Sequence, residues 1–191
     1  MAPSSNCIDL IKKFEGLFLK AYKCPAGVPT IGYGSTMWND GKKVEMGQVI
    51  TLEDAEKLLM WEVMSKTKAL PKMNLTQNQH DSIISFCYNL GVGAFLKSTL
   101  YKKININPND PSIRDEFMKW TKARVKGILT ELPGLVRRRK AEADMYFNTI
   151  TTNKKSKTDI IKDEKTNGLL NVFLFILSVK ALIDIYLLIN I

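Results

Sequence analysis

The chain of 191 residues contains little histidine and little cysteine. Its single histidine is His80, its three cysteines are Cys7, Cys24 and Cys87, and no two of them form a C-x-x-C pair. These counts argue against a structural zinc site of ordinary spacing, and we predict no metal site. The odd number of cysteines leaves at least one free thiol, which suits a reducing compartment, although one disulfide remains compatible with the sequence.

An apolar run of the kind that begins a signal peptide is also missing near the N-terminus. Residues 1–15 include Lys12 and Lys13 but no apolar stretch of the required length, so we expect no conventional export. A chain of 191 residues is long enough for one compact domain with an appendage and too short for two catalytic domains. We therefore expect a single active site.

Acidic residues are outnumbered by basic ones, 19 against 28, which gives a formal net charge of +9. Nucleic acid, anionic lipid and the acidic polymers of a bacterial wall could all bind such a surface. A nucleic-acid module would carry aromatic residues between its basic ones or a recognition helix, and neither is evident, so no nucleic-acid partner is predicted. One basic cluster either attracts wall polymers or lipid or merely solvates helix faces: Lys119, Lys122, Arg124, Lys126 and Arg137 to Lys140.

Helical patterns dominate the chain after one strand-rich stretch. Polar residues 4–6 can cap a first helix that ends at Glu15, before Gly16. Residues 17–44 favour strands and turns and predict a small antiparallel sheet. Apolar spacing, capping pairs and prolines predict further helices over residues 51–66, 76–90, 111–123 and 133–149. This order indicates an α+β protein with a small antiparallel β lobe, a larger helical lobe and a cleft between them.

The composition changes twice toward the C-terminus. We expect a catalytic domain over residues 1–150, a polar Lys-rich linker over 151–168 and an apolar segment over 169–191. As a helix the apolar segment would span about 35 Å, enough for a bilayer core. Lys180 and Asp184 interrupt it, but they lie four residues apart and could pair on one helix face. The segment therefore contacts a membrane, folds back onto the domain, or is an extension without function.

Glu15 is the first candidate for chemistry. It ends the first predicted helix, at the turn into the sheet, between the apolar residues Phe14 and Leu17. Apolar surroundings disfavour the charged form of a carboxyl group, which would let this acid donate a proton near neutral pH. Taken alone, a glutamate at a helix end is usually a solvated surface residue.

The residues around Glu15 form a longer pattern. Its three parts are Phe14-Glu15-Gly16, Ala21-Tyr22-Lys23-Cys24-Pro25-Ala26-Gly27 and Thr30-Ile31-Gly32-Tyr33-Gly34. This pattern resembles the catalytic signature of phage-type lysozymes, the family 24 glycoside hydrolases that include the T4-like and lambdoid endolysins. In that signature a glutamate is followed by eight residues, an aspartate or cysteine, five residues and a threonine, which selects Glu15, Cys24 and Thr30. The resemblance covers about residues 6–148 and includes these further segments: Gln79–Phe95, Ser98–Leu100, Trp120, Leu132–Leu135 and Arg137–Arg139 with Glu142.

The resemblance implies a lysozyme-like fold and an endo-acting hydrolase of bacterial peptidoglycan that needs no cofactor. It would cleave the β-1,4 bond between N-acetylmuramic acid and N-acetylglucosamine. Glu15 would protonate the leaving oxygen, and Thr30 would hold the attacking water on the other side of the sugar, as inversion requires. Gly32 and Tyr33 would belong to the substrate-binding site.

Two positions depart from the common pattern. Cys24 stands where many members have aspartate, and a thiol can act there only as a thiolate, so it serves as nucleophile, as partner of the base, or as a spectator packed in a turn. Ser35 stands where many relatives carry histidine. His80 is predicted to be structural and to lie on the exposed side of a helix start.

These departures keep two other functions open. One is a catalytically silent protein that binds peptidoglycan, and the other is a basic protein that permeabilises membranes through its apolar segment. By the resemblance, we expect a monomer that accumulates in the host cytoplasm, acts on the cell wall at lysis and contacts the membrane only through residues 169–191.

Overall fold

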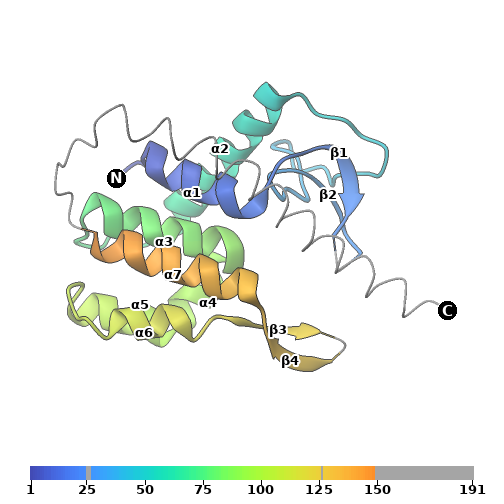
Figure 1. The fold of residues 1–191 in the computed structure, drawn as a ribbon. Helices are drawn as coiled ribbons and strands as arrows, with labels where there is room; N and C mark the ends of the chain where they lie inside the picture. The colour runs from blue at the N-terminus through green and yellow to red at the C-terminus, as the bar shows by residue number, and fades with distance from the viewer. Residues whose placement is uncertain (25–26, 126, 149–191) are drawn as a thin grey trace, which may run out of the picture. The chain divides into compact units, whose positions relative to one another are not determined.

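The fold is that of a computed structural model, which describes residues 1–24, 27–125 and 127–148 (Figure 1). Its elements are α1 (Ser5–Glu15), β1 (Phe18–Lys23), β2 (Pro29–Gly32), α2 (Leu52–Ala69), α3 (Gln77–Leu90), α4 (Val92–Lys97), α5 (Thr99–Ile106), α6 (Ile113–Met118), β3 (Lys122–Val125), β4 (Ile128–Glu131) and α7 (Pro133–Phe147). The predicted α+β class is confirmed, while the cleft and the domain boundaries stay predictions. The predicted linker over 151–168 and the apolar segment over 169–191 lie outside the described residues. Within the described residues, no helix combines the length and apolar character needed to cross a bilayer.

Helix α1 ends where the sequence predicts. Gly16 follows Glu15 with a φ of 70°, and its N–H donates to the carbonyl of Lys12. Ser4 precedes the helix but does not cap it with its side chain. Instead its N–H and hydroxyl donate to the buried carboxylate of Asp81, at 3.1 and 2.5 Å. These bonds tie the start of α1 to α3.

The predicted sheet is a two-stranded antiparallel hairpin. Tyr22 of β1 pairs with Thr30 of β2, and an irregularity separates this pair from the pairing of Phe18 with Gly32. The following loop turns at Gly41, as predicted, where Gly41 N–H donates to the carbonyl of Trp38. The hairpin faces α2, whose first turn is capped by Thr51 through the N–H of Asp54.

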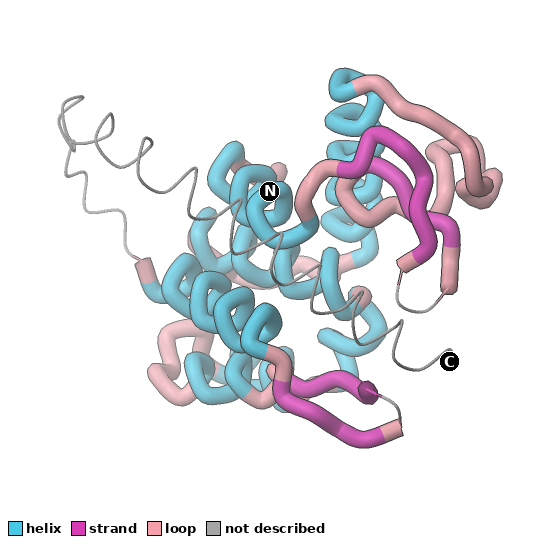
Figure 2. The backbone as a smooth tube through the Cα atoms, turned by 45° about the vertical axis from the view of Figure 1, so that its right-hand side comes forward, coloured by secondary structure: helices cyan, strands magenta, loops and turns pink. Residues whose placement is uncertain are grey.

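Helix α3 is the central helix of the molecule and lies beside both α1 and α7 (Figures 1 and 2). Its N-terminus carries the predicted capping box, in which Thr76 and Gln79 exchange hydrogen bonds. It contributes Ile84 to the apolar core under the β1–β2 hairpin, and Ile83 and Phe86 to the core of the C-terminal helices. Helix α3 is therefore buried on two sides and joins these two cores.

The prediction of one helix over residues 111–123 is wrong. Helix α6 ends at Met118, and β3 pairs with β4 in a second antiparallel hairpin that projects from the helical body (Figure 2). Nearly every residue of this hairpin is exposed, including Ile128 and Leu129. A strand exposed on both faces has no alternation of apolar and polar residues, so the periodicity of the sequence does not reveal it.

Candidate active site

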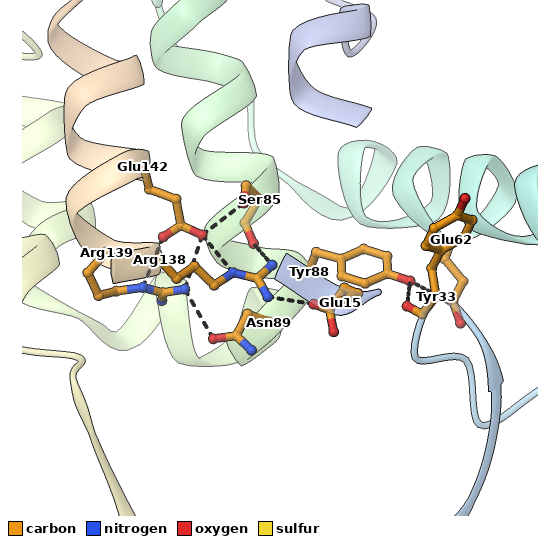
Figure 3. A network of polar contacts seen from close by, with 9 residues as sticks. All are labelled: Glu15, Tyr33, Glu62, Ser85, Tyr88, Asn89, Arg138, Arg139 and Glu142. Atoms are coloured by element: carbon orange, nitrogen blue, oxygen red, sulfur yellow. Dashed lines mark hydrogen bonds and ion pairs between the residues drawn. The ribbon is translucent and has the colours of Figure 1, made fainter. Parts of the chain in front are cut away.

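The carboxylate of Glu15 projects from the last turn of α1 toward α7, and 20% of its side chain is exposed. Its Oε1 accepts a hydrogen bond from Arg138 Nη1 of α7 at 2.5 Å (Figure 3). The ring of Phe14 packs on the same guanidinium, with 5.6 Å between the ring centroid and Arg138 Cζ. The side chain predicted to be the acid is therefore a partly exposed carboxylate held by a buried cation.

Arg138 is fixed on its other sides by the protein interior. Its side chain is 4% exposed, its Nε donates to Glu142 Oε1 at 3.1 Å, and its Nη2 donates to the carbonyl of Ser85 at 3.2 Å. Because the guanidinium is planar and rigid, two such anchors determine where its third nitrogen points. That nitrogen points at Glu15.

The other oxygen of Glu15 lies against Gly34. A Cβ at position 34 would stand 3.2 Å from Glu15 Oε2, and the φ of Gly34 is +92°. Both the contact and the backbone conformation therefore require glycine here. The turn after β2 forms one wall around the carboxylate.

Cys24 and Thr30 lie on either side of the tip of the β1–β2 hairpin. The N–H of Cys24 donates to the carbonyl of Val28, and the hydroxyl of Thr30 donates to the same carbonyl at 3.0 Å. Burial raises the pKa of Tyr22, and the charges of Cys24 and Glu15 raise it further. Tyr22 also pairs with Thr30 across the hairpin.

The two predicted substrate-binding residues are buried. Gly32 lies against Ala55 of α2, and a Cβ there would be 3.6 Å from that of Ala55. Tyr33 is 6% exposed, with Lys12 Nζ 5.5 Å from its ring centroid and its carbonyl 2.9 Å from the hydroxyl of Tyr88. The structure brings neither side chain to the surface, so substrate contact at these positions stays a prediction.

Tyr88 of α3 contacts the turn that follows β2. Tyr88 Oη lies within hydrogen-bond distance of the Tyr33 carbonyl and, at 2.7 Å, of Glu62 Oε2. Burial and then the charge of Glu62 raise the pKa of Tyr88, so its hydroxyl stays protonated. Ser35, at the position where relatives often have histidine, is buried beside it.

The sequence is similar to characterised proteins over most of this domain. The family model described as phage lysozyme matches residues 12–142. The endolysin of Acyrthosiphon pisum secondary endosymbiont phage 1 is 46% identical over 146 residues, which cover 75% of this chain and 96% of that protein. The chain belongs to the phage lysozyme family.

Solved structures agree with this membership. An endolysin from Escherichia coli O157:H7 phage FAHEc1 has a TM-score of 0.72 and 40% identity, covering 78% of this chain and 94% of its own. The muramidase domain of SpmX from Asticaccaulis excentricus has a TM-score of 0.68 and 33% identity, covering 76% and 97%. The lysozyme-like fold and the predicted class of enzyme, a glycoside hydrolase that cleaves peptidoglycan, are confirmed.

Three residues of this phage lysozyme site were not predicted from the sequence. Arg138 was part of a basic cluster expected to lie on the surface, yet it is buried beside Glu15. Gly34 was part of the signature pattern without a link to the carboxylate, and Tyr88 was not singled out. Arg138 and Glu142 lie four apart on α7, and two opposite charges at that spacing were the available signal.

His80 lies away from these residues, and its predicted exposure is wrong. Its side chain is 12% exposed, stands 3.9 Å from Asp81 Oδ1 and lines a cavity of about 380 Å³ with Met1, Leu70 and Leu75. Its structural role stays a prediction. In the part of the chain that the structure describes, no group of three His, Cys, Asp or Glu side chains could hold a metal ion.

Proposed function

We propose that this phage lysozyme is an endolysin that hydrolyses the β-1,4 bond between N-acetylmuramic acid and N-acetylglucosamine with Glu15 as general acid. The observation that carries the proposal is the position of the Glu15 carboxylate. One oxygen is held by the buried Arg138, and the other lies against the backbone of Gly34. A partly exposed carboxyl group held so firmly is suited to donating a proton to a glycosidic oxygen.

Arg138 stabilises the ionised form of Glu15 that exists after proton transfer. Once Glu15 has given its proton to the leaving oxygen, it is a carboxylate 2.5 Å from a guanidinium. The attraction between the two charges stabilises that product of the transfer. Arg138 is therefore a positioning residue that acts through Glu15.

We assign the attacking water to Thr30, which is only 3% exposed, so this water must be an enclosed one. Its hydroxyl hydrogen is used in the bond to the Val28 carbonyl at 3.0 Å, so its oxygen can still accept a hydrogen bond. A water that donates to Thr30 presents a lone pair in a fixed direction, as attack on the anomeric carbon requires. Inversion follows if this water and Glu15 lie on opposite faces of the sugar.

We propose that Cys24, which lies across the hairpin tip from Thr30, acts on the same water. As a thiolate it would attract the proton that the water releases, or stabilise positive charge on the sugar. Replacement by aspartate should preserve activity to within about tenfold if either role holds, and replacement by serine should lower it by more than about tenfold. Equal activity of Cys24→Ser and wild type would make the thiol a spectator.

The test of the proposed function uses the full chain and purified peptidoglycan. Wild type should release soluble muropeptides, and Glu15→Gln, which keeps the shape of the side chain but carries no acidic proton, should release about a thousandfold less. Glu53→Gln, at an exposed position of α2, is the matched control and should behave as wild type. Release by folded Glu15→Gln would refute Glu15 as the acid, and failure of wild type would favour the silent wall-binding alternative.

Location and assembly are part of the same proposal. We expect a monomer that waits in the host cytoplasm and reaches the wall when the membrane opens, with membrane contact confined to residues 169–191. The support for membrane contact is the apolar composition of residues 169–191. Fractionation of cells that produce the full chain, before and after an alkaline carbonate wash, separates a membrane-held protein from a free one.

A further inference from the structure

The strongest unassigned feature is a buried carboxylate behind the proposed acid. Glu142 of α7 is fully buried, and it lies one helical turn from Arg138. Its Oε1 accepts hydrogen bonds from Arg138 Nε at 3.1 Å, Arg139 Nη2 at 3.0 Å and Ser85 Oγ at 2.8 Å. Its Oε2 stands 3.0 Å from Arg139 Nε (Figure 3).

We propose that Glu142 is a positioning residue for the catalytic acid: it anchors Arg138 and balances the positive charge that Arg138 and Arg139 present to Glu15. This inference rests on the proposed role of Glu15 as the acid. It concerns a residue that contacts neither the sugar nor Glu15 and acts only through a guanidinium.

The contacts of Glu142 indicate that it is charged. Burial raises the pKa of Glu142 above its ordinary value, and the guanidiniums of Arg139 and Arg138 and the hydroxyl of Ser85 act in the opposite direction. Three of the four contacts come from guanidinium nitrogens, which can only donate, so a proton on the carboxyl group would leave these donors with a poorer acceptor. The carboxylate is the form that satisfies the geometry.

Charge balance connects this carboxylate to catalysis. Two buried guanidiniums face two carboxylates, Glu142 and Glu15. Without the charge of Glu142, an uncompensated positive charge would lie beside Glu15 and favour its deprotonated form. A deprotonated Glu15 cannot protonate the leaving oxygen, so Glu142 widens the pH range over which the acid works.

Other titratable groups near this cluster do not titrate in the same range. Burial raises the pKa of Cys87 of α3 to about 12, and it also raises that of Cys7 of α1. Burial likewise raises the pKa of Tyr88 and of Tyr22, and the charge of Glu15 raises both further. Burial lowers the pKa of Arg139 only to about 10, so it remains a cation in the assay.

The test is the pH profile of muropeptide release by the full chain between about pH 4 and pH 9. Glu142→Gln keeps the size of the side chain and removes its charge. We expect the alkaline limb of its kcat profile to move down by about one pH unit or more, with KM within about twofold of wild type. A folded Glu142→Gln variant with the wild-type profile overturns the inference.

A matched control separates this effect from a general loss of stability. Glu116 of α6 is also buried and paired with two cations, Lys103 and Lys119, but it belongs to another cluster. Glu116→Gln should lower thermal stability and leave the pH profile in place. Glu15→Gln separates the two proposals: activity in that variant ends the proposed function, whereas an inactive Glu15→Gln with an unshifted Glu142→Gln ends only the inference.

A second variant keeps the inference testable if Glu142→Gln does not fold. Arg139→Gln removes a positive charge from the same cluster without touching Glu15, so it should move the alkaline limb to higher pH. Glu142→Asp retains the charge and should keep the limb within about half a unit of wild type. A shift of Arg139→Gln to lower pH, or none, would overturn the charge balance.

Discussion

At position 34, an added methyl group would contact the carboxylate of the proposed acid. Gly34→Ala places a Cβ 3.2 Å from Glu15 Oε2, and we expect it to lower kcat by at least about tenfold, because Glu15 would have to shift from the position in which Arg138 holds it. Gly41→Ala is the matched control: it carries a similar φ of +85°, and nothing described lies within 4 Å of its added Cβ. Both variants should lose about 1 to 2 kcal/mol of stability for the backbone conformation. Equal activities of the two would contradict the contact with Glu15.

Some residues of the site could be predicted from the sequence, and others could not. Glu15, Cys24 and Thr30 could be selected because they lie within sixteen residues and their spacing matches a known signature. Arg138 could not, because it is 123 residues away from Glu15 and sits in a basic run that is typical of a solvated helix face. Only the packing of α7 on α3 shows which of those cations is buried.

Among the elements, α3 has the most influence on the site, since it supplies Ser85, Tyr88 and Asn89 to the network around Glu15. Its capping box predicts a measurable effect. Thr76→Ala should cost about 1 kcal/mol and lower Tm by about 2 to 4 °C. Activity well below Tm should not change, because Thr76 is at the far end of the helix from these residues. An unchanged Tm in calorimetry would show that the cap contributes nothing.

The elements were predicted best where the sequence carries local signals. Thr51, Thr76 and Gly16 mark helix ends through capping chemistry that acts over three or four residues, and the structure confirms each. The β3–β4 hairpin was missed, although Val125, Ile128 and Thr130 around Gly127 favour strands and a turn. No glycine lies between Pro111 and Gly127, so the sequence carries no cap that would mark the end of α6 at Met118.

For the whole molecule, the buried carboxylate of Glu116 gives the free energy of unfolding a defined pH dependence. Burial raises the pKa of Glu116, but hydrogen bonds from Thr99, Lys119 and Lys103 outweigh it and hold the value at about 2. A carboxyl group with a pKa depressed by folding stabilises the protein above its unfolded value, near 4.3, and that contribution is lost as the pH falls toward 2. Wild type should therefore exceed Glu116→Gln in unfolding free energy by about 2 kcal/mol at pH 6.

The same pair of proteins provides the check. Urea unfolding at several acidic pH values should show the difference between wild type and Glu116→Gln shrinking as the pH falls below about 4. A difference that stays constant down to about pH 2 would mean that Lys103 and Lys119 do not stabilise the charged form.

The identity of the bond that the protein cleaves is tested most directly by the sugars at the ends of the products. Full-length protein should be incubated with purified peptidoglycan, and the released fragments reduced and identified by mass spectrometry. Hydrolysis with Glu15 as acid predicts N-acetylmuramic acid at every new reducing end, and no such product from Glu15→Gln. New ends that carry N-acetylglucosamine or an anhydro sugar, or fragments without any new sugar end, would contradict the account.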